Sequence, residues 1–439
     1  MMITIRRSIR ISAVSIGAVL VLGLIFTSLA AAADNVKAFV GARIIDGTGK
    51  PPIEKATLVI RNDRIEAVGK NVKVPADAQR IDATGKTIIP GLINAHGHVS
   101  TTDQLGMYLR DGITTIWSLG DTCPEARHKA GACMVEFELR EQTRHAEPGT
   151  MPRLYVAGPV INEKTPADAR KAVDEVIAHK PDVVKFREDD YLGSRPKMTP
   201  DVYAAIIDEG HKNGYRVASH IVTLEDAKGV LKAGSDYIAH SVRDVEVDNE
   251  FIQLMKARNI YYCPTFTREV SVFVYPENPS FLKDPFFLKE ADPAELKRVQ
   301  DADFIGKMRT DDGARWYKEH LDIALRNLKK LSDAGIGIAM GTDSGGGTGR
   351  FQGYFEHLEL EYEAKAGLTP MQVLISATSG AAKAMNVSDV GTLEKGKFAD
   401  VLVLTANPLD DIKNTQKIDS VWVAGTRVAQ KSESARASR

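Results

Sequence analysis

His96 and His98 are the residues of this chain whose types and spacing most clearly suggest chemistry. They end an apolar run over residues 88–98, and side chains two positions apart on an extended segment point to the same side. Two imidazoles placed in this way can bind one metal ion. A chain with ten histidines also produces such a pair by chance, and a histidine without a ligand role is the commoner case. Other residues must therefore support the metal site.

Four further candidate ligands stand at or near the ends of apolar runs: Lys185, His220, His240 and Asp343. Short apolar runs bounded by turn signals predict strands that are buried on both faces, as in parallel sheets. In a closed parallel β/α barrel, the carboxyl ends of the strands build the active site. Taken alone, the lysine could extend to solvent, the histidines could be core residues, and Asp343 could cap a turn. Their shared placement favours ligands.

The spacing of these residues fits consecutive strands of such a barrel. Lys185, His220 and His240 are separated by 35 and 20 residues, which leaves room for one crossover each. The longer interval to Asp343 contains a further apolar run at 259–264. Asp343 is then expected to follow the eighth strand.

The rest of the predicted fold follows from the same patterns. Residues 88–386 predict a (β/α)8 TIM barrel of the α/β class, with further strands at 113–117 and 154–157. The periodicity of apolar residues predicts helices at 199–213 and 224–233.

Two features stand outside a minimal barrel. The segments 34–87 and 387–430 alternate apolar and polar residues between turn signals, which predicts short antiparallel strands. The segment 266–318 carries many aromatic residues between the seventh and eighth strands. Because long insertions on the catalytic face are usually functional, we expect a lid or pocket wall there. A helical excursion that packs its aromatics against the barrel is the alternative.

The first 33 residues have the layout of an export signal. Arg6, Arg7 and Arg10 precede an apolar run that ends in small residues at 30–33, as in a secretory signal peptide. A retained membrane anchor is the alternative, because the run is long enough to span a bilayer. We expect cleavage and a periplasmic or extracellular protein.

Composition excludes several partners. Loss of three arginines with the leader changes the net charge from −1 to −4, so neither nucleic acid nor an anionic membrane is an expected partner. Export permits a disulfide between Cys123 and Cys133, with two free thiols as the alternative. The polar tail at 431–439 is expected to be disordered, and the sequence leaves homo-oligomerisation open.

The ordered set of candidate ligands resembles that of the amidohydrolase superfamily of metal-dependent hydrolases. Residues 38–49 resemble the opening of that family, and residues 366–371 and 391–400 resemble its closing signatures. The resemblance spans roughly residues 36–430. Within the superfamily, the chain is most similar to the imidazolonepropionase-like group, which includes Xaa-Pro dipeptidases.

This resemblance implies a barrel beside a small β-sandwich that both chain ends build together. It also implies two divalent metal ions and a role for each candidate ligand. His96, His98 and Asp343 would bind the more buried ion, His220 and His240 would bind the other, and Lys185 would bridge them as a carbamate. Histidine and carboxylate ligands suit zinc and tolerate manganese or cobalt.

Such a site predicts hydrolysis. Two ions about 3.5–4 Å apart polarise a carbonyl and lower the pKa of a water molecule, and Asp343 is the expected general base. We expect a secreted hydrolase that cleaves an amide bond in a dipeptide or N-acyl amino acid. Lys185 argues against mononuclear deaminases, which lack a bridging lysine. Thr223 replaces a glutamate of deaminase-like relatives, and residues 221–223 depart from the Ala-His-Gly of many dipeptidases, which leaves the substrate open.

Two alternatives share this sequence pattern. The same metals could hydrolyse an ester, lactone or cyclic amide, and a catalytically inactive envelope protein could keep the barrel for binding. For a substrate carboxylate, arginine is the best partner because its planar fork donates two parallel hydrogen bonds. Arg243 and Arg268 are the candidates, with a salt bridge such as Arg243 with Glu246 as the alternative. His357 is a further candidate for the substrate pocket, unless it only occupies the last barrel helix.

Overall fold

The computed structural model describes residues 34–120 and 134–430. The expected signal peptide and C-terminal tail lie outside these ranges, as does the expected pair of Cys123 and Cys133. Within the described part of the chain, Cys263 is a buried free thiol. No helix in that part is both long and apolar enough to cross a membrane.

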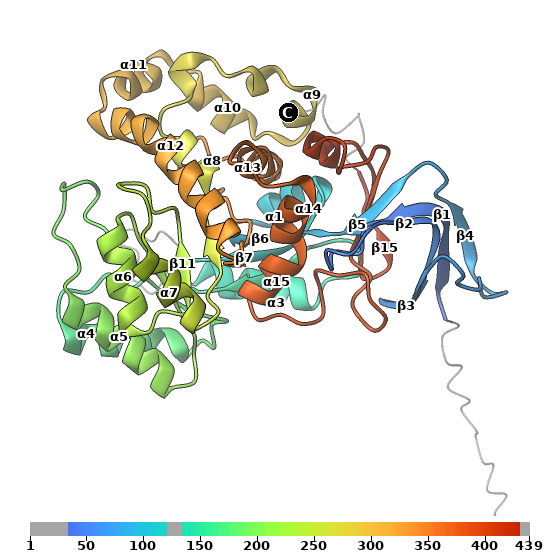
Figure 1. Ribbon diagram of the computed structural model, residues 1–439, viewed down its shortest axis with the longest axis horizontal. Coiled ribbons are helices and arrows are strands. Elements are labelled where there is room, and N and C mark those ends of the chain that lie inside the picture. The colour runs from blue at the N-terminus through green and yellow to red at the C-terminus, as the bar shows by residue number, and fades with distance from the viewer. Residues whose placement is uncertain (1–33, 121–133, 431–439) are drawn as a thin grey trace, which may run out of the picture. The chain divides into compact units, whose positions relative to one another are not determined.

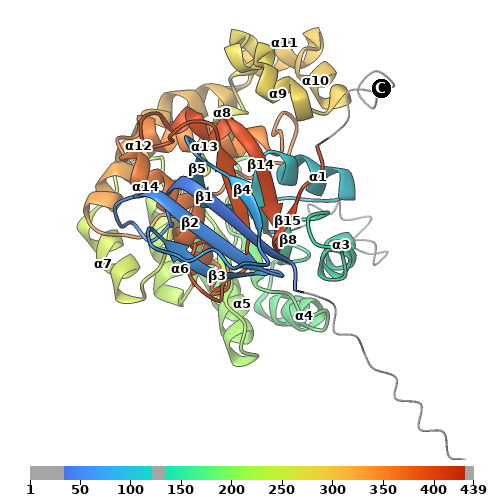
Figure 2. The ribbon, with the colours of Figure 1, turned by 90° about the vertical axis from the view of Figure 1, so that its right-hand side faces the viewer.

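Strands from both ends of the described chain join one eight-stranded sheet (Figure 2). Its strands are β1 (Val36–Ile44), β2 (Ile53–Arg61), β3 (Arg64–Gly69), β4 (Gln79–Asp82), β5 (Thr87–Pro90), β13 (Val401–Leu404), β14 (Ile418–Val423) and β15 (Thr426–Arg427). β5 pairs with both β1 and β13, so the two chain ends meet there. The rings of Phe39 and Trp422 pack with their centroids 5.1 Å apart. β5 runs to Pro90, which places the end of this sheet slightly beyond the expected boundary.

The candidate ligands lie on or beside two parallel sheets. The first contains β6 (Leu92–Gly97), β7 (Ile113–Ser118) and β8 (Arg153–Val156), and the second contains β9 (Val184–Arg187), β10 (Val217–His220), β11 (Tyr237–Ala239) and β12 (Tyr262–Cys263). These strands are almost entirely buried and rich in branched apolar residues, as is typical of parallel sheets covered on both faces. The predicted strands at 113–117, 154–157 and 259–264 are thereby confirmed within a few residues.

Isolated parallel bridges join residues beyond these ladders. They pair Ile161 with Phe186, Tyr262 with Ile338, and Gly97 with Ser344. Among the described residues, however, the ladders themselves define two parallel sheets and no closed barrel. The expected eighth strand before Asp343 is reduced to a bridge at Ile338.

Helices follow most of the parallel strands and cover them (Figure 1). They are α1 (Thr102–Arg110), α3 (Val135–Arg144), α4 (Pro166–Ile177), α5 (Pro200–Lys212), α6 (Leu224–Ala233) and α7 (Asn249–Ala257). The chain continues with α12 (Asp312–Asp333), α13 (Tyr354–Lys365), α14 (Pro370–Ile375), η3 (Ser376–Gly380), α15 (Ala381–Ala384) and η4 (Ile412–Gln416). The bounds of α6 confirm its prediction, because Thr223 caps its first turn and Gly234 ends it with a φ of 109°.

The insertion after β12 is helical. It comprises α8 (Phe266–Val270), η1 (Tyr275–Glu277), η2 (Ser280–Lys283), α9 (Pro285–Glu290), α10 (Pro293–Val299) and α11 (Ala302–Thr310), before α12 begins. Most of its aromatic residues pack with Phe351, Tyr354 and Phe355 in one cluster, while Phe266 and Phe273 pack in the main core. Arg110 of α1 also donates to Glu290 from Nε and Nη2, at 2.9 and 2.8 Å. The insertion therefore matches the alternative of a packed helical excursion, and its helices lie together beside α13 (Figure 1).

Candidate metal centre

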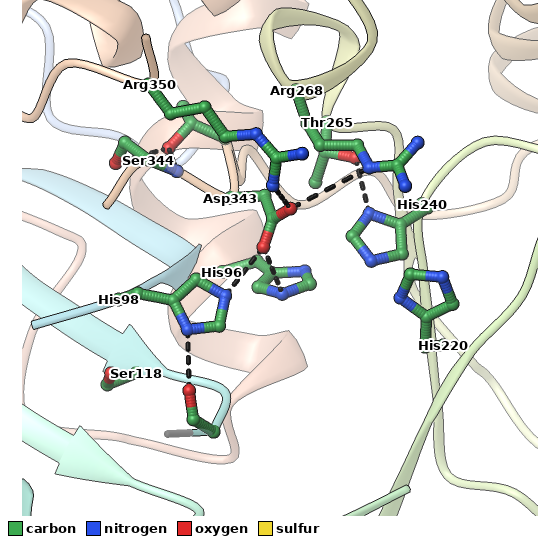
Figure 3. Close-up of polar contacts among 12 residues, drawn as sticks. His96, His98, Ser118, His220, His240, Thr265, Arg268, Asp343, Ser344 and Arg350 are labelled. Atoms are coloured by element: carbon green, nitrogen blue, oxygen red, sulfur yellow. Dashed lines mark hydrogen bonds and ion pairs between the residues drawn. The ribbon is translucent and has the colours of Figure 1, made fainter. Parts of the chain in front are cut away.

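Three predicted ligands converge on one point at the end of β6. Asp343 Oδ1 lies 2.6 Å from His98 Nε2 and 3.3 Å from His96 Nε2 (Figure 3). The candidate ligand atoms of these three buried residues all lie within 4.8 Å of one another. Two imidazole nitrogens and a carboxylate oxygen in this arrangement suit a divalent ion such as zinc. The structure therefore brings these three predicted ligands together in one cluster.

Backbone hydrogen bonds bring the two segments of this trio together. The amide of Asp343 donates to the carbonyl of His96 at 2.7 Å, and the amide of His98 donates to the carbonyl of Ser344 at 2.8 Å. Asp343 has a φ of 57°, a left-handed conformation that a non-glycine residue adopts only where its surroundings enforce it. The hydrogen bonds across the strand ends enforce it here.

Glu356 also links the same two segments through hydrogen bonds. This fully buried carboxylate of α13 accepts hydrogen bonds from four groups: Asn94 Nδ2 (2.7 Å), Thr342 Oγ1 (2.6 Å), Ser344 Oγ (2.6 Å) and the Gly353 amide (2.7 Å). Asn94 Oδ1 in turn accepts from the His96 amide at 2.9 Å. Thr342 and Ser344 flank Asp343, so Glu356 ties both ligand-bearing segments together. The sequence analysis missed this residue, because a lone glutamate on a helix usually faces solvent.

His220 and His240 form the other half of the site. Their ring centroids lie 4.1 Å apart, and His240 lies 4.7 Å from His96. His240 Nδ1 is 2.8 Å from Thr265 Oγ1 (Figure 3), which leaves Nε2 available as a ligand. His240 and Thr265 also have positive φ angles of 79° and 53°. The backbone is thus strained on this side of the site as well.

Lys185 lies on β9, in register with Ala218 of β10. It is only 3% exposed, and its Nζ has no hydrogen-bond partner among the described residues. Burial lowers the pKa of Lys185 to about 7. A buried amine without a partner is costly, which marks this lysine as a functional candidate rather than one that reaches solvent.

The ionisation of the site suits a cation. Burial and the nearby Lys185 lower the pKa of His96 to about 3. Burial also holds the pKa values of His220 and His240 well below the ordinary range. Burial alone would raise the pKa of Asp343, but Arg350 and His98 hold it well below its usual value. Neutral imidazoles and an ionised carboxylate are the forms that bind a divalent ion.

Asp189 is a further buried carboxylate that the sequence analysis missed. Its Oδ2 contacts Nε2 of His220. Burial would raise the pKa of Asp189, but His220 and Arg187 hold it well below its ordinary value. The polar run that contains Asp189 follows the β9 strand, and such a run usually indicates a solvated loop, so no sequence signal singles it out.

Two arginines approach Asp343 from the side of the insertion (Figure 3). Arg350 Nη1 contacts Asp343 Oδ2, and Arg268 Nε lies 3.8 Å from the same oxygen. Nε and Nη1 of Arg268 have no hydrogen-bond partner among the described residues, and its guanidinium lies over the ring of Tyr317, 4.8 Å from the centroid. Arg268 thus has free donors beside the candidate ligands. The sequence analysis missed Arg350 because it stands in a glycine-rich loop.

Arg243 has a different place from the one expected. Its Nη1 donates to Glu269 Oε1 at 2.6 Å, and both side chains are fully buried. Glu246, the expected alternative partner, pairs instead with Arg326 on the surface. The structure thus places Arg243 in a buried ion pair with Glu269.

His357 is likewise a structural residue. Its Nδ1 lies 2.9 Å from Thr415 Oγ1, and its Nε2 lies 2.8 Å from the carbonyl oxygen of Asp111. Burial lowers the pKa of His357 to about 4. Because both ring nitrogens are engaged, the expected role in the substrate pocket is corrected to a link between α13, α1 and η4.

A cavity of about 470 Å³ lies beside the ligands. Its lining includes Arg350 and the glycines at 345–347, together with Gln104 of α1 and Glu295 of α10. A methyl group built on Gly346 would lie 3.0 Å from both Asp343 Oδ1 and His98 Nε2, so the backbone of this loop lies directly against the ligand atoms. The insertion therefore also forms one wall of this cavity, which the loop at 345–347 and Arg350 separate from the candidate ligands.

Comparisons with known proteins agree with this geometry. Residues 87–428 match the amidohydrolase family model. An ochratoxinase from Aspergillus niger is 24% identical over 445 residues, covering 87% of this chain and 84% of that protein. An imidazolonepropionase from Streptomyces avermitilis is 23% identical over 389 residues, covering 86% and 87%.

Solved structures show the same fold. A protein from Bifidobacterium longum described as a candidate prolidase superposes with a TM-score of 0.71 at 26% identity, covering 92% of this chain and 98% of that one. A Xaa-Pro dipeptidase with bound methionine superposes with a TM-score of 0.69 at 21% identity, covering 90% and 99%. The chain is thus similar along nearly its whole described length to proteins that include amide hydrolases.

Proposed function

The chain belongs to the amidohydrolase family, and from this premise we propose that it is a binuclear metal-dependent hydrolase of dipeptides or N-acyl amino acids. The observation that carries the proposal is the convergence of His96, His98 and Asp343 beside two further buried histidines and an unpartnered lysine. The similarity to a structure named as a Xaa-Pro dipeptidase supports an amide bond as the target.

The residues present fit two divalent ions. His96, His98 and Asp343 would hold the first, His220 and His240 would hold the second, and zinc suits this donor set best. When bound, the ions would polarise the scissile carbonyl and lower the pKa of the attacking water.

Lys185 would link the two halves of the site after carboxylation. Because burial lowers its pKa to about 7, a substantial fraction of the amine is neutral near neutral pH. The neutral nitrogen can attack carbon dioxide, form a C–N bond and release one proton to solvent. The product is an anionic carbamate, which would offer two oxygen atoms as metal ligands where an ammonium would be a buried cation without a partner.

Asp343 would move the proton during hydrolysis. Its carboxylate is ionised and faces the ligand cluster, so it can accept a proton from the attacking water and deliver it to the leaving nitrogen. The contact of Oδ2 with Arg350 fixes the orientation of this carboxylate. Delivery to nitrogen is needed because an amine anion is a poor leaving group.

Arg268 would bind the carboxylate of the substrate. Its free Nε and Nη1 donors lie beside Asp343 in a buried setting, where a guanidinium needs an acceptor. A free carboxylate next to the scissile amide is the group that dipeptides and N-acyl amino acids share. Arg268 therefore supports this class of substrate over neutral amides.

The proposal includes the fold and location expected from the sequence. The two parallel sheets and the bridge at Ile338 would together form the (β/α)8 barrel, with the candidate ligands at the carboxyl ends of its strands. The leader at 1–33 would direct export to the periplasm or the exterior.

Hydrolysis of a substrate library tests the proposed function. Zinc-loaded protein is assayed with free dipeptides, N-acyl amino acids, their carboxyl-amidated forms, and esters and lactones of similar size. We expect the fastest turnover on amides with a free carboxylate, and its loss on chelation. Faster turnover of esters or lactones would contradict the amide assignment, and no metal-dependent turnover of any substrate would contradict the enzyme itself.

A further inference from the structure

A buried carboxylate beside His220 has no role in the account above. Asp189 stands four residues after Lys185, just beyond the end of β9, and its side chain is 2% exposed. Its Oδ2 contacts Nε2 of His220, while its Oδ1 accepts the amide proton of Tyr191 at 2.7 Å. The second contact fixes the carboxylate, so that Oδ2 faces the imidazole.

The contact determines which nitrogen of His220 remains free. A carboxylate at one ring nitrogen favours the tautomer with the proton on that nitrogen and leaves the other as a donor to metal. For His220, Nε2 faces Asp189, and no hydrogen bond of Nδ1 to another described residue is found. In His98 and His240 the two nitrogens have the opposite roles. Their Nδ1 atoms face the Gly120 carbonyl and Thr265 Oγ1, so Nε2 is the nitrogen that could bind a metal ion.

Asp189 does not join the converging ligand group itself. Among the residues that the structure describes, the group whose candidate donor atoms converge contains His96, His98 and Asp343. Asp189 instead touches the nitrogen of His220 that has no other partner. That group does not include His220 either, so the role of Asp189 is argued from its contact with Nε2 alone.

We propose that Asp189 is a positioning residue that orients His220 through Nε2 and presents Nδ1 to the second metal ion. The negative charge of Asp189 makes Nδ1 a stronger donor, as carboxylates do for histidine ligands generally. This inference rests on the proposed function, because it assumes that His220 binds the second ion. It adds a determinant of that ion's affinity that lies outside the predicted ligand set.

The surrounding loop offers a matched control. Asp190, the next residue, accepts the amide proton of Gly193 through Oδ1 at 3.0 Å and caps a turn within the loop. It carries the same charge on the same segment and makes no recorded contact with His220. An effect of charge or loop folding alone would be shared by Asp189→Asn and Asp190→Asn.

The first test measures the affinity of each ion. Apo protein, Asp189→Asn and Asp190→Asn are titrated with zinc against a competing chelator. We expect Asp189→Asn to weaken the second ion by about 10–100-fold and to leave the first ion and the thermal midpoint unchanged, with Asp190→Asn like wild type. Wild-type affinity for the second ion in Asp189→Asn, or equal weakening of both ions, would overturn the proposal.

The second test requires no variant at Asp189 and compares the protein before and after metal loading. Long-range nitrogen-15 NMR of apo wild type, with the His220 resonances assigned by their loss in His220→Gln, reports which ring nitrogen carries the proton. We expect the proton on Nε2 before loading and nitrogen-15 shifts of metal ligation at Nδ1 after loading. A proton on Nδ1, or ligation through Nε2, would overturn the role of Asp189.

The two tests separate the inference from its premise. If wild type binds only one ion, the binuclear proposal fails in the titration. The apo spectrum still reports whether Asp189 holds His220, so the two failures have different signatures.

Discussion

The two halves of the candidate metal centre are built in different ways. The half with His98 and Asp343 is held by backbone hydrogen bonds between strand ends and by the buried Glu356. In the other half, His220 and His240 end or follow neighbouring strands, and their rings are held by single side chains. Lys185, on β9 beside the strand that carries His220, is an amine without a partner among the described residues.

This difference has a consequence for metal binding. Ligands fixed by the backbone are ready to bind before an ion arrives, whereas in the proposed centre the other half would lack an anionic bridge until Lys185 were carboxylated. We therefore expect the first ion to bind tightly and the second to depend on carbon dioxide. Replacing a single side chain should therefore change the binding of one ion more than that of the other.

Lys185→Ala should have the largest effect, because it removes the bridge while leaving the first half intact. We expect turnover near background, loss of the second ion and retention of the first. Elemental analysis and carbon-13 NMR after incubation with labelled bicarbonate check this. Lys171→Ala, on the surface of α4, is the control. Two bound ions with normal turnover in Lys185→Ala would refute the bridging role.

Asp343→Asn should separate ligation from proton transfer. The amide keeps an oxygen near His96 and His98 but cannot accept a proton, so kcat should fall by about 10²–10⁴-fold with a smaller loss of the first ion. Steady-state kinetics and metal content of the same samples check this. Asp333→Asn, at an exposed site on α12, serves as control. A parallel loss of metal and turnover would make Asp343 chiefly structural.

Arg268→Met should affect specificity more than chemistry. Loss of a charged hydrogen bond worth about 1.5–3 kcal/mol should lower kcat/KM on free dipeptides by about 10–100-fold. Substrates with an amidated carboxyl terminus should be spared. Arg326→Met removes a surface arginine as a control. Equal losses on both substrate types would mean that Arg268 supports the loop instead.

Glu356→Gln should have the smallest effect and confine it to the first half. The glutamine keeps a side-chain oxygen that can still accept hydrogen bonds from Asn94, Thr342 or Ser344. The affinity for the first ion should therefore fall by about tenfold, the lower end of the range for residues that support metal ligands. A chelator competition assay measures it, with Glu361→Gln on the same helix as control. Weakening of the second ion alone would contradict this assignment.

The contrast between the halves also explains what the sequence could predict. The six candidate ligands could be proposed from the sequence because each stands at or near the end of an apolar run, a local pattern set by the strands. Glu356, Asp189 and Arg350 were missed because their roles depend on partners brought close only by the fold. The partner in the salt bridge of Arg243 could not be predicted for the same reason, since Glu269 stands 26 residues away in the chain. The bounds of α6 were predictable because its capping residues are local.

The number of ions bound by wild-type protein tests the central claim most directly. Protein purified with excess zinc and bicarbonate, then freed of unbound metal, is measured by elemental analysis. The account predicts about two ions per chain. One ion or none at saturation, in folded protein, would contradict a centre built from both halves.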